Sequence, residues 1–210
     1  MSRKTKEEAE RTRTRILASA LSLFVKKGYE HTTFTDVAAR LKMTKGAVYW
    51  HFDTKEALLV ALVQEMLAKF RRQIEDLMPK DELTFPAVAA TMVANAERIV
   101  NDPKGTAFFL LMRTRIRWGN DSMSKTREQL LSSETFGPYH AYVEAISNDI
   151  AAGRVRRDIN PEAVASVCVA IWDGLVQAKI DKFLPCDLTT TLKRSFDALW
   201  ASIRTEAKAS

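Results

Sequence analysis

The chain has 210 residues, of which 46% are hydrophobic and 28% charged, and its formal net charge is +6. This length is enough for one or two domains with a sizeable core. No apolar run approaches the ~20 residues that a membrane span needs, and the charged N-terminus lacks the apolar segment of a signal peptide. We therefore expect a cytoplasmic protein with no membrane partner.

The positive charge is concentrated at the N-terminal end. Residues 1–60 hold 12 Lys/Arg and 7 Asp/Glu, so five of the six net positive charges lie there. Such an excess on one part of a chain is typical of a nucleic-acid-binding surface. The two cysteines, Cys168 and Cys186, have no metal-like spacing and no histidine neighbours. We therefore expect two reduced thiols, with no metal site and no cofactor.

A first helix is predicted from about Glu8 to Lys27, and the apolar residues within it recur at helical spacing. Gly28 suits the position just after its C-terminus. Residues 1–7 are expected to lie before the helix as a solvated arm, with contacts from Arg3, Lys4 and Lys6 to DNA as the alternative.

Residues 33–55 are predicted to form two short helices joined by a tight turn. Thr33 and Asp36 have the spacing of a capping box, and the first helix then runs to about Leu41. Thr44 is a second N-cap candidate, for a helix over residues 45–51. Helices this short are unstable alone, so they must pack on each other and on their neighbours as a helix-turn-helix.

The second short helix has side chains that suit a DNA groove. Its N-terminus offers free amides to a phosphate, and a glycine there leaves room for a backbone to approach. The rings and polar groups that follow suit sugars, thymine methyls and phosphates. The alternative is that the aromatic rings pad a small core. The candidate DNA-binding residues are Thr33, Thr44, Lys45, Gly46, Tyr49, Trp50, His51 and Lys55.

The rest of the chain is predicted to be helical throughout. We expect helices at about 55–78, 85–100, 104–118, 123–152 with a break at Gly137–Pro138, 161–181 and 188–204. With the three helices before them, they make an all-α fold of about nine helices. No Gly/Ser-rich linker separates residues 45–51 from the long helix at 55–78, so the two halves of the chain should be mechanically continuous.

The run T-K-G-A-V-Y-W-H-F-D-T-K-E-A-L, from residue 44, resembles the recognition helix of the tetracycline-repressor (TetR/AcrR) family of bacterial transcription regulators. The upstream run R-I-L-A-S-A-L-S-L-F-V-K-K-G-Y-E-H-T-T-F is similar to the first helix of the same family, and the similarity spans roughly residues 11–66. Phrases such as I-W-D-G-L at residues 171–175 are similar to the drug-efflux regulators of the family. The resemblance implies a helix-turn-helix DNA-binding domain at residues 1–53 and a ligand-binding, dimerising domain at residues 54–210.

The predicted helix at 161–181 is apolar nearly all round, so it should be buried on several sides, and the last helix adds further apolar residues. In the family they form a four-helix interface between two subunits, and the resemblance implies a homodimer here. The alternative is a monomer in which the chain covers these helices itself. The candidate interface residues are Val167, Ile171, Leu192, Phe196 and Leu199.

The helices at 85–100 and 104–118 carry large apolar residues with a few polar neighbours. Such a set suits a small-molecule pocket, but a stripe of this kind forms an ordinary core more often than a pocket. The resemblance implies a chamber for a hydrophobic or amphipathic inducer. The candidate ligand-binding residues are Asn95, Phe108, Phe109, Met112, Arg113 and Trp172.

Catalytic motifs are missing from the sequence: the three histidines are scattered, and no nucleophile is paired with a base. We expect no enzyme and no catalytic residues. The hypothesis is a repressor that binds a palindromic double-stranded DNA operator as a homodimer and is released by an inducer, with an efflux pump as a candidate target. The alternative is a DNA-binding protein without an inducer, with a structural or cell-division role.

Overall fold

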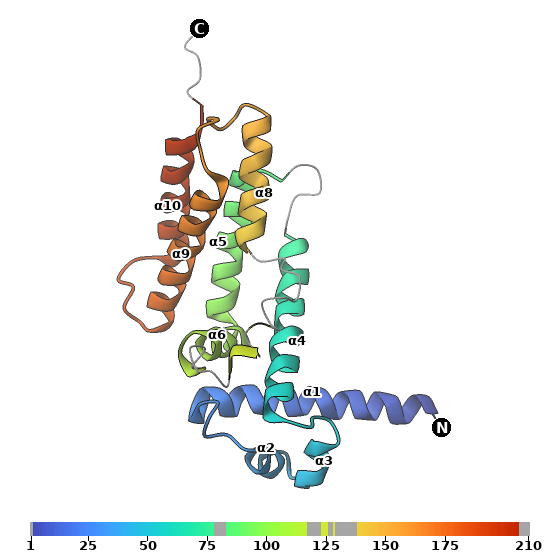
Figure 1. Cartoon of the computed structure of the whole chain (residues 1–210). Coiled ribbons are helices and arrows are strands. Elements are labelled where there is room, and N and C mark those ends of the chain that lie inside the picture. Colours follow the sequence, from blue (N-terminus) through green and yellow to red (C-terminus); the bar gives the residue numbers. More distant parts are fainter. Residues whose placement is uncertain (1, 78–82, 117–122, 126–127, 129–137, 206–210) are drawn as a thin grey trace. The chain divides into compact units, whose positions relative to one another are not determined.

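The computed structural model describes residues 2–77, 83–116, 123–125, 128 and 138–205 (Figure 1). Over these residues it consists of helices, connecting turns and one isolated β-bridge between Val155 and Arg204. The all-α fold is therefore confirmed. The chain packs as two compact units, one of residues 1–69 and 104–134 and the other of residues 70–103 and 135–210. The division by task at residues 53 and 54 stays a prediction.

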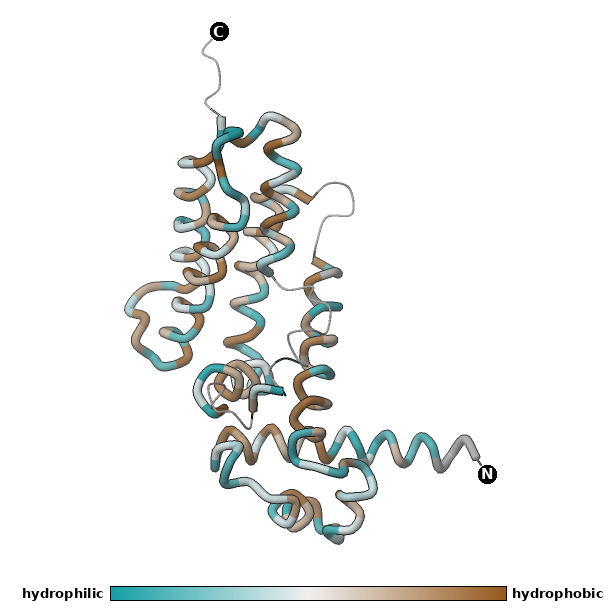
Figure 2. The backbone as a smooth tube through the Cα atoms, in the orientation of Figure 1, coloured by the Kyte–Doolittle hydropathy of each residue, from teal (hydrophilic) through white to brown (hydrophobic). Residues whose placement is uncertain are grey.

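The first unit contains α1 (Ser2–Lys27), α2 (Phe34–Leu41), α3 (Lys45–Tyr49) and the start of α4 (Lys55–Glu75). It also contains α6 (Pro103–Leu110) and the π-helical turn η1 (Leu111–Arg115), which contacts α1. α2 packs on both α1 and α3. Hydrophobic residues gather on the first turns of α4 (Figure 2). The core of the unit includes Ile16, Phe24, Val37, Val48 and Leu58.

Helix α1 begins at Ser2, which corrects the expectation of an arm over residues 1–7. No glycine or proline interrupts this stretch, and its Lys, Glu and Arg residues favour helix. The helix ends at Lys27 as predicted, where Gly28 adopts a φ of +85° and donates its N–H to the Phe24 carbonyl at 2.9 Å.

Helix α4 starts where the sequence indicates, because Thr54 Oγ1 accepts a hydrogen bond from the Ala57 N–H at 3.0 Å. It ends at Glu75, three residues earlier than expected, and Pro79, the expected stop, lies outside the described residues.

The helix expected at residues 104–118 is shorter and changes character. After Leu110 the backbone widens into η1, and Ile116 is extended, with φ −117° and ψ 128°. The Thr114 hydroxyl donates to the Leu110 carbonyl at 2.8 Å, a contact that loosens and bends helices. Gly119 and Asn120, the expected end, lie outside the described residues.

The second unit contains α5 (Phe85–Asn101), α8 (Pro138–Ala151), α9 (Pro161–Ile180) and α10 (Leu188–Ile203), which lie side by side (Figure 1). α5 packs against α10 and α8, and α8 packs against α9. The break expected in the helix at 123–152 falls on Gly137, outside the described residues, and α8 begins at the next residue. The core includes Phe85, Met92, Tyr142, Ile146, Leu192 and Phe196.

Asp149, near the end of α8, joins two elements of this unit. Its side chain is fully buried, and its Oδ2 accepts a hydrogen bond from the Phe85 N–H at 2.8 Å, at the start of α5. Its Oδ1 accepts from the Arg154 guanidinium at 2.6 Å, in the loop that follows α8. A buried carboxylate is costly unless it is paired, and here both oxygens are satisfied.

Candidate nucleic-acid interface

The turn between α2 and α3 is held by local hydrogen bonds. Thr33 Oγ1 accepts from the Asp36 N–H at 3.2 Å, and Asp36 Oδ2 accepts from the Thr33 N–H at 2.8 Å, so the predicted capping box is present. The Lys27 ammonium, at the end of α1, lies 2.5 Å from Asp36 Oδ1. These bonds, that of Lys27 first, lower the pKa of Asp36 to about 2. Thr33 and Asp36 therefore aim α2 relative to α1.

Helix α3 is anchored by very few residues. Thr44 Oγ1 accepts from the Ala47 N–H at 3.2 Å, which confirms the second N-cap, and Val48 is completely buried. Past Tyr49 the backbone continues in turns, in which the His51 and Phe52 N–H groups donate to the Val48 carbonyl. Phe52 is buried and closes the short connection to α4. The side of α3 opposite Val48 is therefore available for contacts outside this core.

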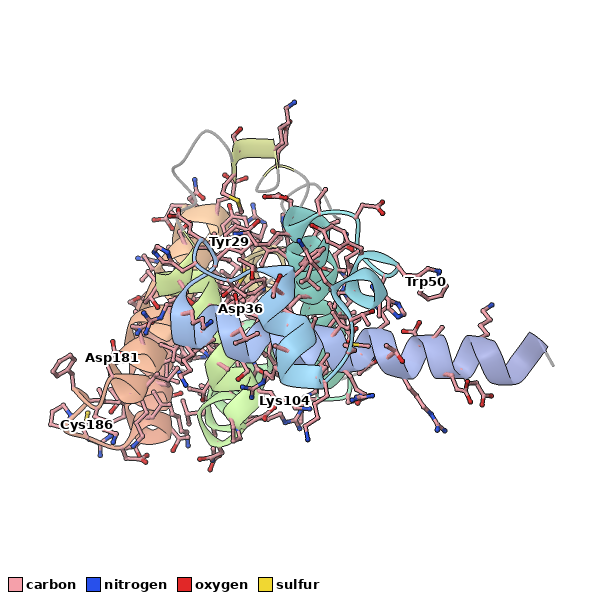
Figure 3. The ribbon with its side chains drawn as sticks, turned by 90° about the horizontal axis from the view of Figure 1, so that it is seen from below. Tyr29, Asp36, Trp50, Lys104, Asp181 and Cys186 are labelled. Carbon is pink, nitrogen blue, oxygen red and sulfur yellow. The ribbon has the colours of Figure 1, made fainter. Side chains whose placement is uncertain are left out.

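That outer side carries two aromatic rings. Tyr49 is 45% exposed, with its ring edge-on to Phe34 at 4.8 Å and the Lys45 ammonium 5.5 Å from its centre. Trp50 is 73% exposed and points away from the protein (Figure 3). A ring that exposed contributes little to a core, so Trp50 is not the packing residue that the alternative interpretation requires.

His51 lies perpendicular to Trp50, with the ring centres 4.6 Å apart. Partial burial and, second, the positive charge of Arg13 lower its pKa below the ordinary histidine value, while Glu10 acts in the opposite direction. The imidazole is therefore neutral at pH 7, so one ring nitrogen donates and the other accepts a hydrogen bond.

Lys55 has partners inside the protein. Its ammonium donates to the carbonyls of Tyr29 at 3.0 Å and Glu30 at 3.1 Å, and it lies 4.5 Å from the centre of the Tyr29 ring. The Tyr29 hydroxyl in turn donates to Glu56 Oε1 at 3.1 Å, and burial is the first reason that the pKa of this tyrosine is raised. The first turn of α4 is thus tied to the loop that follows α1.

Arg13 makes a second tie that the sequence did not reveal. Its guanidinium lies 3.5 Å from Glu65 on α4 and 5.5 Å from the centre of the Phe52 ring. The contacts of Arg13 with Glu65 and of Tyr29 with Glu56 and Lys55 have no local spacing that marks them, because the partners are 26 to 52 residues apart. Lys27 and Asp36, nine residues apart, lie closer in sequence.

The candidate ligand-binding residues fall into both units. In the first, Phe108 and Phe109 are buried, Met112 is half-buried, and the exposed Arg113 guanidinium lies 5.8 Å from the centre of the Phe109 ring. In the second, Trp172 donates its indole N–H to the Met92 carbonyl at 2.8 Å.

The sixth candidate, Asn95, also lies in the second unit. It is buried, and its Oδ1 has no hydrogen-bond partner in the described part of the chain. A common chamber for all six residues stays a prediction.

The candidate interface residues differ in exposure. Val167 is 45% exposed, and Ile171 and Leu199 are half-buried. Leu192 and Phe196 have relative exposures of 0% and 2% in the single chain, where Phe196 packs on Tyr142 with ring centres 5.9 Å apart. A partner would bury almost nothing more of these two residues. They belong to the core of the unit, and a place for them in a subunit interface stays a prediction.

Among the described residues, no group of three His, Cys, Asp or Glu side chains could hold a metal ion. Both cysteines are free. Burial raises the pKa of the Cys168 thiol to about 12, so it stays protonated, whereas Cys186 is exposed on the loop between α9 and α10 (Figure 3).

Helix α9 is long and apolar enough to cross a membrane by length and composition, and 22% of its most apolar window is buried within the chain. The expectation that no segment reaches such a length does not hold for it. Helices that are buried in proteins outside membranes also meet these criteria.

Comparisons with known proteins agree with the geometry. A family model described as "Bacterial regulatory proteins, tetR family" matches residues 16–62. The chain is 40% identical over 181 residues to the "Probable acrEF/envCD operon repressor" of Escherichia coli K12, which covers 84% of this chain and 80% of that protein.

Solved structures share the fold. NalD, described as the secondary repressor of the MexAB-OprM multidrug efflux pump in Pseudomonas aeruginosa, superposes with a TM-score of 0.73 at 21% identity, over 96% of this chain and 100% of NalD. A SmeT–triclosan complex superposes with a TM-score of 0.73 at 21% identity, over 93% of each chain.

Proposed function

This chain belongs to the TetR family of bacterial regulatory proteins, and we propose that it is a homodimeric repressor whose α3 enters the major groove of a palindromic operator. The exposed pair Tyr49 and Trp50 is the observation that carries the proposal, because Tyr49 stays 45% and Trp50 73% exposed although each ring contacts one neighbouring ring. They stand beside Lys45, whose charge suits a phosphate.

Gly46 supports the same surface. Its backbone is not left-handed, and an added Cβ would meet only Thr44 Oγ1, at 3.9 Å. The fold itself therefore does not need a glycine at this position. A DNA backbone that approaches α3 closely does need one, since any side chain there would hold it away.

We propose that two subunits pair through the outward face of α9. Small and apolar residues line this face, and they are exposed or half-buried in the single chain: Ala163, Val167, Ala170, Ile171 and Gly174. An apolar face of this length is stabilised when a second copy covers it. A dimer would repeat α3 twice, so the operator half-sites should lie about one helical turn of DNA, or a multiple, apart.

The inducer is proposed to bind among the helices that follow α4 in the chain. Asn95 supports this, because a buried acceptor without a partner costs about 1–3 kcal/mol that a ligand's donor would recover. The complex of SmeT with triclosan supports a hydrophobic inducer. The role of NalD as a repressor of an efflux pump supports an efflux-pump operon as the target. Because α3 and α4 are joined by only five residues, a shift of α4 would re-aim α3.

The test is selection of binding sites from random duplex DNA, followed by footprinting and by release with a panel of hydrophobic compounds. We expect a near-palindrome, two chains per site, and loss of selectivity in Tyr49→Ala and Trp50→Ala. An asymmetric site that binds one chain contradicts the dimer. Tight binding that no compound releases favours a DNA-binding protein without an inducer.

A further inference from the structure

A groove lies between α5 and α10 in the second unit, and it has a volume of about 280 Å³. One wall is α5, where small residues recur on one face at Pro86, Ala89, Ala90 and Val93. Their spacing of three or four residues places them along a single stripe. Because none of them is large, the space beside this stripe remains open.

The floor and far wall of the groove are aromatic. The rings of Phe85 and Trp200 are stacked, with centres 5.6 Å apart and planes 13° from parallel. Phe85 is fixed by the hydrogen bond from its N–H to Asp149 and by packing on Tyr142, with ring centres 5.6 Å apart. Trp200 remains half-buried, so part of its surface faces the groove. A rigid aromatic wall favours a flat ring, because little side-chain freedom is lost on binding.

The rim of the groove has one positive and one negative side chain. Lys193 and Asp197 are exposed and one helical turn apart on α10, and each lines the groove. Among the described residues neither takes part in an ion pair. The ammonium is a donor for a carboxylate, and the carboxylate is an acceptor for an N–H or O–H group. A ligand with both groups would satisfy both residues.

We propose that this groove is a second small-molecule site, for a planar aromatic acid that also bears an N–H or O–H donor. The ring lies against Trp200, the acid on Lys193 and the donor on Asp197. The volume is just below the usual range of ligand pockets, about 300–1,000 Å³, which restricts the ligand to one or two rings. The site is independent of Asn95 and of the proposed inducer chamber.

The groove would stay open in the proposed dimer. At about 100° per residue, Lys193, Asp197 and Trp200 fall within an arc of about 60° on α10. Leu199 and Ser195 fall on the opposite flank, so a partner that covers α9 and this flank leaves the groove free.

Isothermal titration of the full chain tests the site with three probes. Indole-3-acetate has both the acid and the N–H donor, 1-methylindole-3-acetate lacks the donor, and 3-methylindole lacks the acid. We expect one indole-3-acetate per chain with a Kd of about 0.1 mM, the strength typical of a ligand of this size. Both other probes should bind at least about tenfold more weakly.

Variants locate the binding. Ala90→Phe fills the groove from an exposed position and should abolish binding, whereas Ala94→Phe, also exposed on α5 but outside the groove, should not change it. Lys193→Met should weaken indole-3-acetate about tenfold and leave 3-methylindole unaffected. Asp197→Leu, which has no acceptor, should remove the preference for the N–H probe over its N-methyl analogue.

Three results would overturn the proposal. One is the absence of binding heat for all three probes up to about 2 mM, twenty times the expected Kd. Another is unchanged binding in Ala90→Phe, which would place the probe elsewhere. The third is dissociation of the dimer by Ala90→Phe but not by Ala94→Phe in sedimentation, which would make the groove a contact between subunits.

Discussion

Gly46 allows stability and DNA binding to be separated at a single residue. It occupies the second position of α3 with space for a Cβ around it. Gly46→Ala should therefore raise the free energy of unfolding by up to about 1 kcal/mol. The same methyl group should weaken operator binding at least about tenfold, or ~1.4 kcal/mol, by holding the DNA backbone away. Urea unfolding and a fluorescence binding titration measure the two effects.

Gly28→Ala is the matched control. Its φ of +85° is strained for alanine, so this variant should lose about 1 kcal/mol of stability instead of gaining it. Equal operator affinity for Gly46→Ala and the parent would contradict a close approach of DNA to α3.

Lys55 has two possible roles, and the salt dependence of binding distinguishes them. Because its ammonium holds two carbonyls of the loop after α1, Lys55→Met should cost about 1–3 kcal/mol of stability. We expect the slope of log K against log salt to stay unchanged. A slope smaller by about 0.9 would show that the ammonium contacts a phosphate instead.

Asp36 makes the helix-turn-helix sensitive to acid. Its pKa in the folded protein is about 2, below the ordinary 3.8, so its ionised form stabilises the fold. This contribution is complete above about pH 4 and is lost as the pH falls toward 2. Asp36→Asn should lower stability at pH 7 and show a shallower loss between pH 4 and pH 2. The free energy of unfolding, measured at several pH values, tests this expectation. The same pH dependence in the parent and in Asp36→Asn would contradict the role of Asp36.

At the scale of elements, Asp149 holds the end of α8 to the start of α5. Asp149→Ala leaves the Phe85 N–H and Arg154 without this acceptor and should cost about 3–5 kcal/mol of stability. Asp158→Ala, which removes an exposed carboxylate 3.8 Å from Arg156, should change stability by less than about 1 kcal/mol. Urea unfolding midpoints, with unchanged m-values, compare the stability of the two variants. Similar losses of stability in both would contradict the role given to Asp149.

Local signals in the sequence predicted the elements well. Thr33, Thr44 and Gly28 act within four residues of themselves, so their spacing predicted a helix start or end that the structure confirms. The predicted start of α1 was wrong, because no residue near Ser2 marks a helix start and the helix continues through good helix formers. The widening at η1 has no clear sequence signal.

Tertiary partners were harder to predict than helices. Apolar spacing correctly placed Leu192 and Phe196 on a buried face of α10, but it could not tell a face covered by the same chain from one covered by a second copy. In the same way, the identity of Lys55 suggested a phosphate contact, while the carbonyls that it binds come from residues 25 and 26 positions away.

At the scale of the whole molecule, α9 determines the predicted assembly. Ala170 is exposed on its outward face, so Ala170→Glu should place a desolvated charge in the subunit interface and produce folded monomers. Ala94→Glu, the same change at an exposed position of α5, should remain a dimer. Sedimentation and circular dichroism measure mass and folding. A dimeric Ala170→Glu protein would move the interface away from α9. Phe196→Glu should instead unfold the chain, because Phe196 is in its core.

The contact between η1 and α1 means that α4 is not the sole mechanical link to the DNA-reading helices. There are two connections. One runs through α4 and its bonds to the Tyr29 loop, and the other runs from α6 through η1 into α1. If both connections carry the response to an inducer, loosening either one should weaken that response without abolishing it.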